Sequence, residues 1–190
     1  MMQRVNRGNG WPQRFDELVA AMHDDGRAMD CGGGDRCYGD SRVINLEVSE
    51  YPTVDVVASV LGIPFPDDHF DVILSQAVLE HVPDPQLAVN EMARVLKPGG
   101  RLYIEAAYQQ PGHLWPHHYF NICPNGLAHL LRDLTVIDSG VFNDLDFTIP
   151  WMLRAAGSDA PVERIARMLR GTRSKNLHLV ASAVFAEVTK

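Results

Sequence analysis

Residues 71–85, with the sequence DVILSQAVLEHVPDP, constrain the fold more than any other part of this chain. The segment 70–75 is almost wholly apolar, which is typical of a strand in a parallel sheet covered on both faces. Asp84 followed by Pro85 predicts the start of a helix, because the aspartate can cap the first turn and proline lacks an N–H that would be unpaired there. Residues 98–100, Pro-Gly-Gly, end that helix before another apolar strand. Strands that alternate with helices in this way predict a parallel α/β sheet.

The remaining patterns extend this order along the chain. Further strands are expected at 27–30, 43–48, 54–58, 102–106, 135–142 and 177–188, and further helices near 12–22, 127–134 and 161–170. Residues 1–11 are expected to form a flexible N-terminal arm, and residues 12–190 a single domain, since no repeat or linker divides them.

Composition excludes several classes of protein. No apolar run approaches the roughly 18 residues of a membrane span. A net charge of −7 argues against a general nucleic-acid surface. The three cysteines form no C-x-x-C pair and there is no secretory leader, so we expect reduced thiols, no zinc site of the C-x-x-C type and a cytoplasmic protein.

A glycine turn follows the first predicted strand, in the sequence Met-Asp-Cys-Gly-Gly-Gly-Asp at 29–35. Glycines there allow a ligand to approach the backbone closely, at the carboxyl edge of the sheet where α/β folds bind ligands. Taken alone, the motif is equally compatible with a tight turn that binds nothing. Glu47 ends the next strand, and its two carboxylate oxygens could accept both hydroxyls of a ribose. Taken alone, it is more typical of a solvated strand end.

Two further segments could form an acceptor site. Ser75, Gln76 and His81 follow the 70–75 strand, and an imidazole there could act as a base near neutral pH, although bracing of the loop is the more common role. Residues 113–120 contain His113, His117 and His118 among aromatic rings, and could cover a substrate or simply pack as a surface lid.

These motifs together resemble the class I S-adenosylmethionine (SAM)-dependent methyltransferases, in particular the methyltransferase type 11 group. The resemblance covers about residues 26–132 and is most specific in the run Pro-Phe-Pro-Asp-Asp-His-Phe-Asp at 64–71. It implies a doubly wound, mostly parallel, seven-stranded Rossmann-like sheet that is closed by a C-terminal antiparallel hairpin.

The resemblance also implies a cofactor and a set of site residues. SAM would bind and S-adenosylhomocysteine would be the product, with the acid at Glu47 on the ribose. The expected cofactor-binding residues are Asp30, Cys31, Gly32, Gly33, Gly34, Glu47, Val48, Ser59, Val60, Ser75 and Gln76. The candidate bases are His117 and His118, followed by His81.

The chain departs from the family pattern at several positions. Arg36 replaces the third glycine of the pattern Asp/Glu-x-Gly-x-Gly-x-Gly, and Ser59 replaces an aspartate that holds the adenine amino group. Only residues 35–42 link the glycine turn to the next strand, whereas a parallel crossover usually needs a dozen or more. The usual helix is therefore expected to be short or missing. One side of the pocket would then be more open, or covered by the N-terminal arm or by a second subunit of a homo-oligomer.

The resulting expectation is methyl transfer from SAM to an O, N or C nucleophile of a small-molecule acceptor. One alternative is a non-catalytic SAM-fold binding or scaffold protein, and a third is a nicotinamide-dependent dehydrogenase. Ubiquinone-pathway O-methyltransferases resemble the Leu-Glu-His-Val run at 79–82 and bind a metal through acids around it. Because residues 76–78 supply no further carboxylate, we expect no metal site here.

Overall fold

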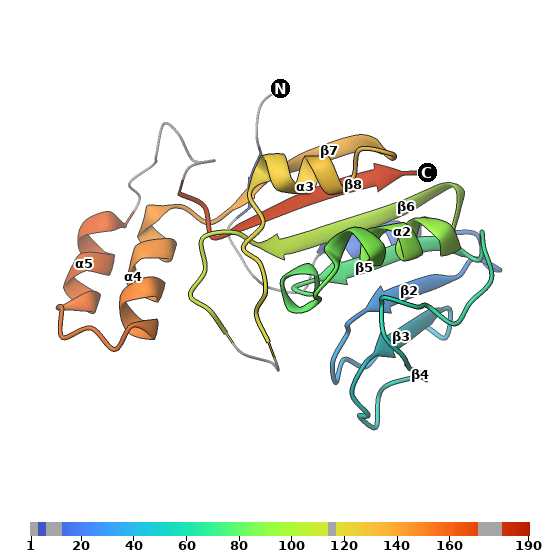
Figure 1. Cartoon of the computed structure of the whole chain (residues 1–190), viewed down its shortest axis with the longest axis horizontal. Coiled ribbons are helices and arrows are strands. Elements are labelled where there is room, and N and C mark those ends of the chain that lie inside the picture. The colour runs from blue at the N-terminus through green and yellow to red at the C-terminus, as the bar shows by residue number, and fades with distance from the viewer. Residues whose placement is uncertain (1–3, 7–12, 114–116, 171–179) are drawn as a thin grey trace.

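The computed structural model of the chain describes residues 4–6, 13–113, 117–170 and 180–190, and its elements form one eight-stranded sheet with helices on both faces (Figure 1). The strands are β1 (Arg4–Asn6), β2 (Ala28–Cys31), β3 (Val43–Glu47), β4 (Val56–Val57), β5 (Phe70–Gln76), β6 (Leu96–Ala107), β7 (Thr135–Phe142) and β8 (Ala183–Thr189). Their order across the sheet is β1-β7-β8-β6-β5-β2-β3-β4. Only β8 runs antiparallel to its neighbours, β6 and β7. The doubly wound sheet and the C-terminal antiparallel hairpin expected from the sequence are therefore confirmed.

Two apolar cores lie on opposite faces of the sheet. The helix α1 (Gln13–Ala20) buries Phe15, Leu18 and Val19 on one face. The other face is covered by α2 (Pro85–Val95) and α3 (Pro124–Leu130). Because both faces of β5 are covered, the apolar run that starts at Phe70 is buried throughout its centre.

The helix α2 begins as its sequence predicts. The Asp84 side chain accepts a hydrogen bond from the Leu87 N–H at 2.9 Å, and Pro85 occupies the first helical position. The short 3₁₀ turn η1 (Leu79–His81) precedes it and connects it to β5. The end of β5, η1 and the start of α2 therefore form one rigid corner of the site.

Two elements were not predicted from the sequence. Residues 4–6, in the segment expected to be a flexible arm, form β1, which pairs in parallel with β7 and adds an eighth strand. Residues 145–155 form α4 (Leu145–Ala155), although Pro150 lies inside it and argued against a helix. The predicted helix near 161–170 is α5 (Val162–Leu169).

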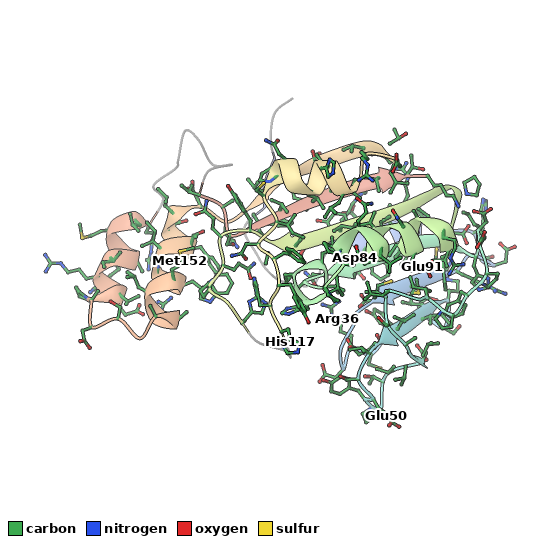
Figure 2. All side chains as sticks on the ribbon, viewed as in Figure 1. Arg36, Glu50, Asp84, Glu91, His117 and Met152 are labelled. Atoms are coloured by element: carbon green, nitrogen blue, oxygen red, sulfur yellow. The ribbon has the colours of Figure 1, made fainter. Side chains whose placement is uncertain are left out.

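The helices α4 and α5 pack on each other and lie apart from the sheet, with Met152 of α4 in this pair (Figures 1 and 2). The side chains of Val162, Ile165 and Leu169 are half-buried, and none of the residues of α5 is fully buried. Residues 177–179 of the predicted last strand lie outside the described residues. No helix in the described part of the chain is long and apolar enough to span a bilayer.

Candidate cofactor and acceptor site

A cavity of about 410 Å³ lies at the carboxyl ends of β2, β3, β4 and β5. The chain passes from β2 toward β3 on one side and from β5 toward β6 on the other, so this is the topological switch point of the sheet. The volume falls within the range of small-molecule sites. Its walls are formed by Gly32, Gly34, Glu47, Val48, Ser49, Tyr51, Ala58, Ser59, Val60, Leu61, Ala77, Val78, His81, Val82 and Pro83.

The glycine turn forms the floor of this cavity. Gly32 has φ +81° and Gly34 has φ +59°, which is a conformation that other residues adopt at a cost. A Cβ on Gly32 would lie 2.4 Å from Cγ2 of Val78, whereas a Cβ on Gly34 would meet no atom within 4 Å. Gly32 is therefore required by packing, and Gly34 leaves its backbone open to a ligand.

Glu47 lies beside this turn at the end of β3. One oxygen of its carboxylate accepts from the Gly34 N–H at 3.0 Å, and the other accepts from the Val48 N–H at 2.7 Å. The Ser49 N–H also donates to the second of these oxygens at 3.3 Å, so only the oxygen bonded to Gly34 keeps a second lone pair. Glu47 thus lies at the cavity wall, and its role toward a ribose stays a prediction.

The crossover from β2 to β3 contains no helix, as expected from its length. Residues 32–42 are turns and irregular chain, and the buried amide of Asn45 replaces the packing that a helix would give. The Asn45 Nδ2 lies within 3.0–3.2 Å of the carbonyl oxygens of Gly34, Arg36 and Thr53. The sequence offered no signal for this role, since a polar residue in a short strand is unremarkable.

Asp30 does not line the cavity, although the family pattern places it at the cofactor. Its buried carboxylate accepts a hydrogen bond from the Tyr38 hydroxyl and another from Arg36 at 2.8 Å. Burial raises the pKa of Asp30, and the positive charge of Arg36 and the bond from Tyr38 oppose that rise. The arginine that replaces the third glycine is therefore the counter-ion of this aspartate.

The Arg36 contact continues into a chain of polar side chains across β5 and β6. Arg36 donates to Gln76 at 2.6 Å, Gln76 donates to Glu105 at 2.7 Å, and the Tyr103 hydroxyl donates to Glu105 at 3.0 Å. The oxygen and the nitrogen of the Gln76 side chain are therefore both hydrogen-bonded within the protein. Cys31 and Ser75 are fully buried, and a Cβ on Gly33 would clash with Asn45. None of these predicted cofactor residues belongs to the cavity wall.

The loop after β4 forms the part of the cavity wall where the resemblance places the adenine of the cofactor. Ser59 is exposed, and its hydroxyl accepts from the Leu61 N–H at 3.1 Å. Glu91 of α2 accepts from the Ile63 N–H at 2.9 Å, and Arg94 donates to the Ile63 carbonyl at 2.9 Å. This loop is therefore fastened to α2, and no sequence motif indicated that anchor.

The histidines expected on the acceptor side do gather. His81, at the end of η1, lines the cavity, and its ring lies 4.8 Å from that of His113 and 5.7 Å from that of His118. The ring of His117 is exposed and lies 5.6 Å from Tyr119, at the same sheet edge as Arg36 (Figure 2). The His118 Nε2 lies 3.0 Å from Asn121 Oδ1. His117 and His118 do not line the cavity, and Trp115 lies outside the described residues.

Comparison with known proteins finds similarity to methyltransferases over part of the sequence. Residues 33–104 match the family described as methyltransferase domain. The ubiquinone/menaquinone biosynthesis C-methyltransferase UbiE of Shewanella woodyi is 43% identical over 83 residues, which are 41% of this chain and 33% of that protein. The chain thus spans about a third of the length of the curated relatives it matches.

Solved structures resemble a much larger part of the chain. The 1,6-didemethyltoxoflavin-N1-methyltransferase of Burkholderia thailandensis, with bound S-adenosylhomocysteine, is similar with a TM-score of 0.60 and 18% identity, over 94% of this chain and 77% of that one. The geranyl diphosphate C-methyltransferase of Streptomyces coelicolor gives a TM-score of 0.58 and 17% identity, over 93% and 75%. At such identities the likeness concerns the fold. The sequence match covers residues 33–104, and over the described residues the chain shares its fold with solved methyltransferase structures.

Proposed function

We propose that this chain transfers the methyl group of SAM to an O, N or C nucleophile of a small-molecule acceptor. The observation that carries the proposal is the cavity at the switch point, whose floor is the open Gly34 backbone and whose wall includes the Glu47 carboxylate. When bound, the cofactor supplies an electrophilic methyl group on a sulfonium. The protein's own part is to hold the reactants in line and to exclude water.

The residues present fit the adenosyl part of the cofactor. The Glu47 oxygen that accepts from Gly34 keeps a lone pair for a ribose hydroxyl, and the exposed Ser59 hydroxyl lies on the wall beyond it. Ser59 is already an acceptor for the Leu61 N–H and carries no charge, so it would hold the adenine amino group more weakly than the family's aspartate. We therefore expect weaker binding than in relatives with the full motif.

The acceptor enters on the side of η1, His113 and residues 117–120. His81 faces the cavity from this side, and its Nδ1 lies 2.6 Å from the His117 carbonyl, which ties the lid segment to the corner after β5. A base is needed only if the acceptor is a hydroxyl or another protonated group. We propose His117 or His118 for that role, to be tested by single-turnover methyl transfer in His117→Ala and His118→Ala once an acceptor is known.

A non-catalytic SAM-fold protein is the second candidate. Arg36 occupies the turn where the family has its third glycine, and the crossover over residues 32–42 lacks the helix that usually supports the cofactor. Such a protein could bind SAM or S-adenosylhomocysteine as a signal without transferring the methyl group. Its distinguishing feature would be binding of SAM or S-adenosylhomocysteine without turnover for any acceptor.

Calorimetric titration of the purified chain with SAM, S-adenosylhomocysteine and NAD tests the proposal. We expect both adenosyl-sulfur ligands to bind with one site per chain, and NAD to give no heat of binding. Binding of NAD alone would favour the dehydrogenase alternative. Absence of binding by SAM and S-adenosylhomocysteine would contradict the proposal.

A further inference from the structure

Glu80 is a buried carboxylate that the methyltransferase chemistry does not use. Its exposed fraction is 0%, and neither carboxylate oxygen has a hydrogen-bond partner within the described residues. An isolated charge in such a place is unfavourable unless a cation or a donor compensates it.

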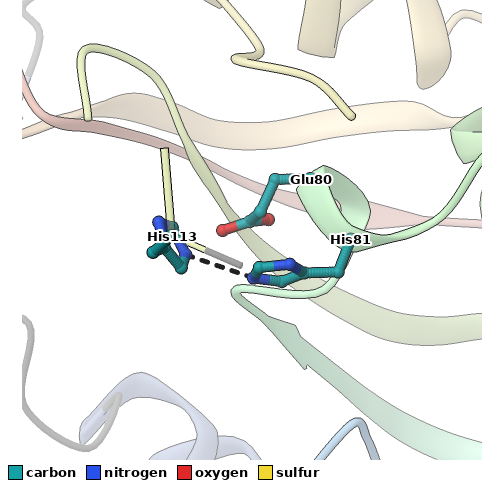
Figure 3. A group of neighbouring side chains, drawn as sticks. All are labelled: Glu80, His81 and His113. Atoms are coloured by element: carbon teal, nitrogen blue, oxygen red, sulfur yellow. Dashed lines mark hydrogen bonds between the residues drawn. The ribbon is translucent and has the colours of Figure 1, made fainter. Parts of the chain in front are cut away.

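Two imidazole rings face this carboxylate. The side chains of Glu80, His81 and His113 each offer a ligand atom, and these atoms all lie within 4.8 Å of one another. Figure 3 shows the Glu80 carboxylate directed toward the two rings, with the nitrogen atoms of His81 and His113 facing each other. The Nε2 atoms of the two rings are 3.1 Å apart.

Backbone carbonyls determine which nitrogen of each ring carries the proton. His81 Nδ1 lies 2.6 Å from the His117 carbonyl oxygen, and His113 Nδ1 lies 3.2 Å from the Pro111 carbonyl oxygen. A carbonyl only accepts, so both Nδ1 atoms are the donors and both Nε2 atoms are bare in the neutral rings. Two bare nitrogens cannot hydrogen-bond to each other, so this pair of tautomers suits a cation between the rings.

The spacing of the two Nε2 atoms is compatible with ligation of one metal ion. Ligand nitrogens about 2.1 Å from a metal stand about 3.0 Å apart at a right angle and about 3.4 Å apart at a tetrahedral angle. The observed 3.1 Å between the Nε2 atoms lies inside that interval. The Glu80 carboxylate offers the third ligand atom, within 4.8 Å of the ligand atoms of both histidines.

We propose that Glu80, His81 and His113 bind a divalent transition-metal ion, with Zn²⁺ as the reference ion, beside the cofactor cavity. Imidazole nitrogen with one carboxylate favours such ions over Mg²⁺, which prefers oxygen ligands. Three protein ligands leave a coordination position open, as in sites where a metal also contacts a substrate. The two carbonyls that hold the Nδ1 protons orient the rings as outer-shell partners do in metal sites.

The proposal departs from the sequence-based expectation of no metal site. That expectation considered only residues close to Glu80 in the chain, whereas His113 lies in the segment after β6, 32 positions after His81. It stands independently of methyl transfer, because metal binding can be measured without SAM. The alternative is a proton between the two Nε2 atoms, which would make one ring an imidazolium that donates a hydrogen bond to the other ring.

Metal binding to the full chain tests the proposal directly. Chelator-treated protein is titrated with Zn²⁺ by calorimetry, and with Co²⁺ by visible absorption, in parallel with Mg²⁺. We expect one Zn²⁺ per chain, a Co²⁺ spectrum that Zn²⁺ abolishes, and no binding of Mg²⁺ at the same concentrations. His113→Ala and the near-isosteric Glu80→Gln should each weaken Zn²⁺ binding roughly tenfold or more.

The exposed His129 of α3 provides a matched control, since His129→Ala removes an imidazole from another part of the fold. It should bind Zn²⁺ as the wild type does. Circular dichroism confirms that each variant is folded, and His113→Asn replaces His113→Ala if the latter is not. A wild-type chain without stoichiometric Zn²⁺, or Zn²⁺ affinity unchanged in both His113→Ala and Glu80→Gln, would overturn the proposal and leave the shared proton. SAM titration of the same samples is a separate measurement, so its failure bears only on the proposed function.

Discussion

Single residues decide the shape of the glycine turn, and Gly32 and Gly34 do so for different reasons. Both have positive φ, but only Gly32 lacks room for a side chain, because Val78 lies against it. The floor of the cavity thus depends on the close contact between Gly32, in the turn after β2, and Val78, in the segment after β5. Gly34 contributes a backbone N–H to Glu47 and an open surface.

We predict that Gly32→Ala destabilises the protein by about 1–3 kcal/mol more than Gly34→Ala, because it adds an overpacked contact to the shared cost of positive φ. Urea unfolding of both variants gives the difference. Equal costs in the two variants would show that the contact with Val78 relaxes freely.

The ion pair between Asp30 and Arg36 leads to a second prediction at the scale of single residues. Removing the arginine leaves a fully buried carboxylate without its counter-ion, whereas removing both charges does not. We expect Arg36→Met to lower the free energy of unfolding by roughly 3 kcal/mol. This value is at the low end for buried ion pairs, because 29% of the Arg36 side chain is exposed. The double variant Asp30→Asn/Arg36→Met should recover part of that loss.

Equilibrium unfolding of the two variants measures this recovery. A double variant no more stable than Arg36→Met alone would mean that Asp30 needs no counter-ion. The remaining bond from Tyr38 would then be sufficient for it.

At the scale of elements, the loop between β4 and β5 owes its position to α2. Glu91 and Arg94, which bond to each other at 2.8 Å, contact the Ile63 backbone through an N–H and a carbonyl. The hydrogen bonds from Arg94 lower the pKa of Glu91, despite the opposing effect of burial. A carboxylate whose pKa is lower in the folded state stabilises that state above its unfolded pKa and loses this effect as the pH falls through the folded value.

We therefore predict that Glu91→Gln is less stable than the wild type at neutral pH, and that the difference shrinks as the pH falls below about 4.5, the ordinary pKa of a glutamate. Urea unfolding of both proteins between neutral pH and acid pH measures this difference. Glu50→Gln, at an exposed position, serves as the control. A difference that stays constant across that range would contradict the assignment.

Elements also show where sequence reasoning succeeds. The helix α2 was predictable because its signals, Asp84 and Pro85, are local and act on the first turn. The helix α4 was missed because Pro150 is unfavourable in isolation, and packing against α5 outweighs it. The strand β1 was missed because residues 4–6 show no strand pattern by themselves and gain their hydrogen bonds from β7.

At the scale of the molecule, the sheet order follows from the resemblance together with alternating strands and helices, and it places the glycine turn, Glu47 and His81 around one cavity. The same reasoning could not place Asp30 away from the cavity, because that depends on Arg36 turning back to it. It could not find Asn45, Glu91 or the contact of His81 with His113, because each depends on a partner distant in the chain. Local motifs thus give the location of the site, and the fold gives its contacts.

The central claim is that this cavity binds SAM with Glu47 on the ribose, and calorimetric titration of SAM into wild type, Glu47→Ala and Glu50→Ala tests it most directly. Glu50 is an exposed acid close to Glu47 in the chain, so its variant controls for net charge (Figure 2). Glu47→Ala removes one or two charge-assisted hydrogen bonds of roughly 1.5–3 kcal/mol each, which is about tenfold to a hundredfold in affinity per bond. The account predicts that loss in Glu47→Ala and wild-type affinity in Glu50→Ala. Equal affinity of a folded Glu47→Ala and the wild type would contradict it.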